Sequence, residues 1–280
     1  MKKRLVAGLV QWLMQLAGAI AYAAPRGLER VLYGLLKVMK YRGKVVAKNL
    51  AITGLEQAAN ADAVYRFLAR VFVETLWLSR ATAAEVDAKV AVSEPDLLAQ
   101  ALAEGGTTVV LTGHFGNWEM LLQKSAVHHR HRIVASYLPL SNAGAELFMR
   151  DMRTRHGADL LIGHKVLRYA LQQPAGYTLS LVADQTPGRG EGTALPFFGV
   201  GTHFFDGGAQ LASRFNMRVL FAEMVYDESL QRYALTFHKC PFENAVDITR
   251  WYVDKLEETI RKRPGDYLWT HRRFKHDGVY

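Results

Sequence analysis

Cysteine is almost absent from this 280-residue sequence, which contains only Cys240. A single cysteine excludes an internal disulfide and a thiolate metal cage, and it is typical of a reducing compartment. Internal repeats, low-complexity tracts and Pro/Ser-rich linkers are also absent. Charged residues make up 22% and hydrophobic residues 50% of the chain, which excludes disordered, collagen-like and disulfide-scaffold proteins. The length is sufficient for one large domain, or two small ones, with a buried core.

Acidic residues are the scarcer charged type, because 26 Asp and Glu face 35 Lys and Arg. The resulting net charge is +9, and the sequence pI is about 9.6. A basic protein favours acidic partners, which include nucleic acid, an anionic membrane face and an acidic carrier protein. Charge alone does not choose among these three.

Residues 5–24 form an uncharged, mostly apolar run that follows three basic residues. As a helix this run would extend for about 30 Å, the thickness of one bilayer core. Residues 21–23, Ala-Tyr-Ala, imitate a signal-peptidase site, but the apolar run is longer than the usual core of a signal peptide. We therefore predict an uncleaved membrane anchor. A cleaved signal and a soluble core helix are the alternatives.

Residues 26–48 contain seven lysines and arginines and a single acid, Glu29. Apolar residues recur between these charges at helical spacing, as they do in an interfacial amphipathic helix. Such a basic segment is expected on the cytoplasmic side, against anionic lipid. We predict that residues 1–40 form an anchor and amphipathic helix, followed by one domain over residues 41–280. Basic residues on both flanks leave open whether the first helix spans the bilayer or lies along its surface.

Strands and helices are expected to alternate through the second part of the chain. This alternation predicts an α/β fold, with a mostly parallel central sheet flanked by helices. Polar residues that follow the strands mark the edge where such sheets usually hold ligands. Strands are expected at residues 107–112, 132–137, 177–183, 218–225 and 232–237, and helices at residues 62–80, 118–126, 144–155, 208–215 and 248–263.

The strongest chemical signal is Gly-His-Phe-Gly-Asn-Trp-Glu at residues 113–119, directly after a buried strand. His114 and Glu119 would point about 140° apart on one continuous helix. They are expected to meet only if His114 lies in the turn and Glu119 in the first helical turn. Gly113 and Gly116 provide backbone freedom for such a turn.

A carboxylate bonded to one imidazole nitrogen leaves the other nitrogen free to take a proton from a hydroxyl. Because no serine or cysteine lies beside His114 and Glu119 in the sequence, we predict a base that acts on the substrate's own hydroxyl, without a covalent enzyme intermediate. The alternative is a histidine that merely caps a helix.

This motif closely resembles the signature of the bacterial lipid A late acyltransferases, the lauroyl/myristoyl transferase family. Later segments resemble other family elements in the same order, and the likeness extends from about Lys44 to Lys275. These segments are Tyr-x-Pro-x-x-Asn at residues 137–142, Arg-x-x-x-Gly at 153–157, Asp184-Gln185, and Pro-Phe-Phe-Gly at 196–199.

The resemblance implies a membrane-bound enzyme with a glycerolipid-acyltransferase-like fold. It would move a fatty acyl chain from acyl carrier protein, or from acyl-CoA, onto a hydroxyl of a lipid acceptor similar to a lipid A precursor. No cofactor or metal is implied. His114 would be the base and Glu119 its orienting acid, while Arg153 would bind phosphate or stabilise negative charge. Asp184 would shape the site, and Asn117 and Asn142 would bind substrate.

The implied location is the bacterial inner membrane, with the catalytic domain on the cytoplasmic face and in contact with anionic lipid. A lysophospholipid or ornithine-lipid O-acyltransferase would share the chemistry but use another acceptor. A His/Asp metallohydrolase is a further alternative, but residues 128–131, His-His-Arg-His, have no acid nearby in the sequence to complete a metal site. We therefore expect a solvated loop there.

A nucleic-acid-binding protein would explain the charge but not the apolar N-terminus or the His114 motif, so we expect no nucleic-acid partner. The basic and aromatic segment at residues 269–275 fits a nucleic-acid patch, a membrane or carrier-protein contact, or C-terminal packing.

Overall fold

The computed structural model describes residues 2–129, 131–173 and 176–276. Over these residues the chain forms a seven-stranded sheet of order β1-β9-β8-β2-β5-β3-β4 and a separate two-stranded hairpin, β6-β7. Every neighbouring pair in the large sheet is parallel except β8 and β9. The predicted α/β fold with a mostly parallel sheet is therefore confirmed. The strands are β1 (Val90–Val92), β2 (Thr108–Thr112), β3 (Ile133–Tyr137), β4 (Asp159–Ile162), β5 (Thr178–Val182), β6 (Thr193–Phe197), β7 (Val200–Phe204), β8 (Arg218–Asp227) and β9 (Arg232–Lys239).

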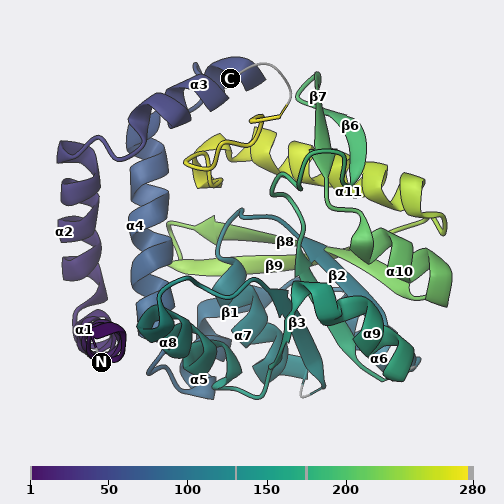
Figure 1. Cartoon of the computed structure of the whole chain (residues 1–280), viewed down its shortest axis with the longest axis horizontal. Helices are drawn as coiled ribbons and strands as arrows, with labels where there is room; N and C mark the ends of the chain where they lie inside the picture. The colour runs from purple at the N-terminus through teal and green to yellow at the C-terminus, as the bar shows by residue number, and fades with distance from the viewer. Residues whose placement is uncertain (1, 130, 174–175, 277–280) are drawn as a thin grey trace.

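Helices cover both faces of the sheet (Figure 1). The central strand β2 is buried along its whole length, because Val109 and Leu111 pack into one core and Val110 into the other. This burial on both faces explains its unbroken apolar sequence. The helices are α1 (Lys2–Ala23), α2 (Pro25–Val38), α3 (Gly43–Thr53), α4 (Ala61–Leu78), α5 (Ala83–Lys89), α6 (Leu97–Ala103), α7 (Trp118–His129), α8 (Ala143–Thr154), α9 (Val166–Gln172), α10 (Gly207–Phe215) and α11 (Ala245–Lys262).

The ten elements expected from the sequence are present, with ends that differ by up to three residues. The sequence did not predict β1, β4 or the β6-β7 hairpin. β1 and β4 are short, and β6 contains Pro196, a residue that weakens a strand signal. The hairpin turns at Phe198 and Gly199, both of which have positive φ.

The N-terminal segment forms two consecutive helices that lie beside the α/β sandwich. In the part of the chain that the structure describes, one helix is long and apolar enough to cross a membrane, and it runs from Arg4 to Ala23. This helix, α1, packs against α4 and α8, while α2 runs alongside α4 (Figure 1). Most large apolar side chains of α1 remain exposed, among them Leu9, Trp12 and Leu16. The helix therefore has one face on the protein and a wide apolar face open to its surroundings.

Close contact between α1 and α8 depends on Gly144. A Cβ atom at this position would lie 2.0 Å from the carbonyl oxygen of Ala7. We expect Gly144→Ala to lower the free energy of unfolding by about 1–3 kcal/mol, because the two helices must separate. Thermal unfolding of the purified protein in detergent measures this change.

The matched control is Gly8→Ala. Gly8 follows Ala7 in α1, but no atom lies within 4 Å of a new Cβ atom at this position. This control should be neutral or slightly stabilising, because alanine favours a helix over glycine. Equal unfolding temperatures for the two variants would contradict the proposed importance of the α1–α8 contact.

Candidate active site

The register of the sheet brings His114 and Asp184 together. Thr112 and Val182 are the last paired residues of the parallel strands β2 and β5, and His114 and Asp184 each follow two residues after the end of their strand. The imidazole Nδ1 of His114 lies 2.6 Å from Oδ1 of Asp184, and the His114 backbone N–H donates to Oδ2 at 3.0 Å. Both oxygens of one carboxylate thus hold the histidine at the carboxyl edge of the sheet.

Asp184 is an ionised and deeply buried partner, with 2% of its side chain exposed. Burial alone would raise its pKa, but the charge and hydrogen bonds of His114, together with the Tyr267 hydroxyl, outweigh burial and lower the pKa to about 2. In the neutral imidazole, an ionised acceptor at Nδ1 favours the tautomer that carries its proton on Nδ1 and a lone pair on Nε2. The His114 side chain is 15% exposed, so the imidazole reaches the surface of the site.

Two further residues lie against the imidazole. The side-chain amide of Gln185 lies 3.3 Å from Nε2 of His114, and the Trp118 ring meets the imidazole edge-on, with 4.6 Å between ring centroids. Gln185 and Trp118 belong to the sequence motifs, but no role was predicted for either. Gln185 directly follows Asp184 and Trp118 directly precedes Glu119, and these positions were the only indication in the sequence.

The prediction that Glu119 orients His114 is wrong. Glu119 lies in the first turn of α7, and its carboxylate instead forms a bidentate ion pair with Arg153 of α8. The Arg153 Nε and Nη2 atoms lie 2.9 and 2.5 Å from the two Glu119 oxygens. The physical reason is the path of the chain: α7 starts after the turn that holds His114, and its first turn faces α8, while β5 presents Asp184 directly to the histidine.

Arg153 is held on three sides. Besides the ion pair with Glu119, its guanidinium lies 5.8 Å from the centre of the Tyr137 ring, and its backbone carbonyl accepts a hydrogen bond from Gln123. The Glu119 carboxylate is buried. The Arg153 guanidinium is thus fixed in place, with its charge balanced by Glu119, and a role for Arg153 in substrate binding stays a prediction.

The two predicted asparagines start helices. Asn117 is fully buried, and its side chain accepts from the Met120 N–H and donates to Glu74. Asn142 caps α8 by accepting from the Gly144 and Ala145 N–H groups. Substrate contacts for the asparagines stay predictions, and the structure gives both side chains this different, structural use.

The C-terminal segment supports the turn that carries His114. Leu268 donates to the His114 carbonyl oxygen, and Phe115 forms a bridge with Tyr267. Further along, Trp269, Arg273 and Phe274 are buried. The structure supports C-terminal packing for these three side chains, whereas Arg272 and Lys275 of the same segment are exposed.

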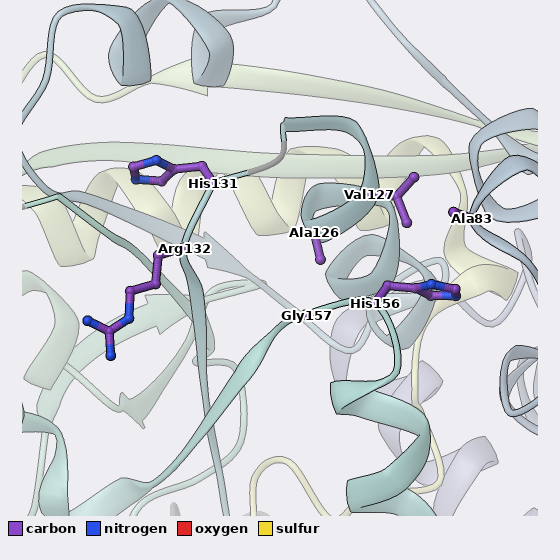
Figure 2. A pocket seen from close by; sticks show the side chains of 7 residues that line it. All are labelled: Ala83, Ala126, Val127, His131, Arg132, His156 and Gly157. Atoms are coloured by element: carbon purple, nitrogen blue, oxygen red, sulfur yellow. The ribbon is translucent and has the colours of Figure 1, made fainter.

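A depression of about 550 Å³ lies at the opposite, amino edge of the sheet. Figure 2 shows its lining, in which His131 and His156 lie far apart and point in different directions. A second cavity, of about 570 Å³, is lined by Pro25, Glu74 and Tyr226 near the junction of α1 and α2. Neither cavity includes His114 or Asp184, so the candidate active site is defined by its side chains and by the sheet edge.

Residues 5–276 match the family described as Bacterial lipid A biosynthesis acyltransferase. This match covers nearly the whole sequence, so the chain belongs to that family and is an acyltransferase. A comparison with curated proteins finds no match.

Proposed function

We propose that this protein transfers a fatty acyl chain from a thioester donor, acyl carrier protein or acyl-CoA, to a hydroxyl of a lipid acceptor resembling a lipid A precursor. The observation that carries the proposal is the His114–Asp184 pair. It provides a partly exposed imidazole, in which the Asp184 carboxylate at Nδ1 favours a lone pair on Nε2, at the edge of the sheet where α/β proteins hold ligands. Membership of the acyltransferase family supports the reaction class.

The proposed reaction is a single displacement. Nε2 of His114 takes the proton of the acceptor hydroxyl as its oxygen attacks the thioester carbonyl carbon. The tetrahedral intermediate then expels the thiolate, the carbon–sulfur bond breaks, and the imidazolium returns its proton to sulfur. The products are an oxygen ester and a free thiol. Asp184 keeps the imidazole oriented and stabilises the imidazolium while it exists.

The Gln185 amide lies where the proposed reaction requires the acceptor hydroxyl. Because it lies at hydrogen-bond distance from Nε2, it marks the place that the acceptor hydroxyl would take on binding. The Arg153 guanidinium, held by Glu119, and the backbone N–H groups at the N-terminus of α7 lie at the same edge and offer hydrogen-bond donors. We propose that these groups stabilise the negative charge that develops on the carbonyl oxygen or on acceptor phosphate.

We also propose a membrane location, and the apolar surface around the same elements supports it. The close contact at Gly144 places α1 beside the start of α8, and the strand that precedes α8 ends at Tyr137, next to Arg153. Leu138, Leu140 and Leu147 around this segment are exposed, as is most of α1. We propose that this apolar surface enters the cytoplasmic leaflet of the inner membrane, so that a lipid acceptor reaches the site along the leaflet. The net charge of +9 would favour anionic lipid and an acidic carrier protein.

The decisive experiment incubates the purified full-length protein in mixed micelles with acyl thioesters of carrier protein or of CoA. A lipid A precursor, a lysophospholipid and an ornithine lipid are offered as separate acceptors, and mass spectrometry follows the products. We expect the lipid A precursor to gain one acyl chain. Acylation of only the lysophospholipid or ornithine lipid would replace the proposed acceptor but keep the chemistry, and no acylation of any acceptor would overturn the proposal.

A further inference from the structure

The last turn of α7 carries a cluster that the sequence did not predict. His128 and His129 lie there, and Asp96, the residue that caps α6, faces both imidazoles. One carboxylate oxygen, Oδ2 of Asp96, lies 3.0 Å from Nε2 of His129 and 3.4 Å from Nε2 of His128. The expectation of a solvated loop is therefore wrong for His128 and His129, which end α7, and the fold brings them an acid, Asp96, from 32 residues before His128 in the sequence.

Each histidine also has an oxygen atom near its other ring nitrogen, Nδ1. Nδ1 of His129 lies 3.3 Å from the Ser125 carbonyl oxygen, and Nδ1 of His128 lies 3.4 Å from Oδ1 of Asp87. Each imidazole thus has an acceptor oxygen beside both nitrogens, whereas a neutral imidazole carries only one proton. If Nδ1 keeps that proton, each Nε2 presents a lone pair toward Asp96. A cation between these three atoms would satisfy all of them.

We propose that Asp96, His128 and His129 bind one divalent transition-metal ion, zinc being the best match. Their ligand atoms lie within 4.8 Å of one another. A tetrahedral zinc site with bonds of roughly 2.0–2.1 Å separates its ligand atoms by about 3.3 Å, close to the two distances observed from Asp96. A carboxylate or carbonyl that holds the far nitrogen of a ligating histidine, as Asp87 and Ser125 do, is the usual support of such a site.

The surroundings suit a structural ion with one open position. The His129 side chain is 1% exposed, whereas that of His128 is 38% exposed, so solvent can supply the fourth ligand. The other oxygen of Asp96 accepts from the Leu98 and Ala99 N–H groups, which fixes the carboxylate at the start of α6. Lys124 pairs with Asp87 and neutralises this supporting carboxylate. The ion would join α6 to α7.

This site is separate from the proposed catalytic chemistry. At about 1.5 Å per residue, the last turn of α7 lies roughly 15 Å along the helix axis from the first turn, which carries Glu119. The ion therefore has no part in acyl transfer, and its binding is measured independently of activity.

The test uses the full-length protein in detergent, without a histidine tag and after removal of metal with a chelator. Titration with Zn²⁺ against a chromophoric competitor should show one tightly bound equivalent, with a Kd at or below about 1 μM. Co²⁺ should give the intense visible bands of a tetrahedral site, and Zn²⁺ should raise the unfolding temperature.

Three variants locate the site. Asp96→Asn keeps an oxygen for the α6 cap and His128→Ala removes an exposed side chain, so both should fold while losing at least about 100-fold in affinity. Asp87→Asn should lose about 10- to 100-fold, because it only orients His128. The matched control, His131→Ala, should bind as the wild type does. Absence of a tight equivalent in the wild type, or unchanged affinity in both Asp96→Asn and His128→Ala, would overturn the proposal.

Discussion

Replacing His114 with alanine is expected to reduce acyl transfer by about 1,000-fold or more. The substitution removes the one proposed general base, and general-base catalysis contributes roughly 100- to 10,000-fold in enzymes. The loss should appear in kcat and in kcat/KM, because binding of the acyl chains does not depend on the imidazole. Steady-state rates at saturating donor and acceptor measure it.

The matched control for this variant is His238→Gln. His238 is also half-buried and also bonds to a carboxylate, that of Glu223 at 2.8 Å, but it lies on β9 rather than at the proposed site. Its replacement should change the rate less than about threefold, in line with the small effects of most substitutions away from a site. Turnover by His114→Ala at a rate close to that of wild type would remove the central inference of the proposed mechanism.

Asp184→Asn is expected to have the second-largest effect, a fall in kcat of about 100- to 10,000-fold. An asparagine keeps the shape of the side chain but no longer fixes the proton on Nδ1 of His114, and it no longer stabilises the imidazolium. Because only the chemical step depends on this tautomer, KM should change little. The control is Asp159→Asn at the exposed pair with Arg132, where kcat should stay within about twofold.

A stability measurement accompanies the Asp184 variant. The folded-state pKa of Asp184 is about 2, below its ordinary value of 3.8, so the ionised carboxylate stabilises the fold above about pH 4. This contribution is lost as the pH falls toward 2. Removing the charge therefore costs on the order of 2 kcal/mol at neutral pH, and rates must be compared per folded molecule. A loss of only a few-fold in kcat would show that another residue orients His114.

Much of the fold was predictable because burial leaves a strong local signal. The apolar run of β2 and the helical spacing of α4 specify element type without tertiary information, and the alternation of elements predicts a parallel sheet. Short strands with little periodic signal, such as β1 and β4, were missed. The position of the candidate site after β2 was also predicted, because the glycine-flanked turn adjoins a recognisable strand.

The partners within the site were not predictable from spacing. Glu119 is five residues from His114, yet it pairs with Arg153, while Asp184 reaches His114 from 70 residues away. Likewise, Asp96 meets His128 and His129 only because α6 and α7 pack on the same face of the sheet. Such pairs depend on strand register and helix packing, which connect residues distant in the sequence.

The amino-acid sequence by itself determined the basic charge, the apolar N-terminal helix, the α/β alternation and the histidine-bearing turn. Each of these features depends only on the composition and periodicity of a short stretch of sequence. The tertiary structure alone decided which acid holds His114, since β2 and β5 pair in parallel and end level with each other. It also decided that α1 lies against α4 and α8, because glycines at the contact allow helix backbones to approach closely.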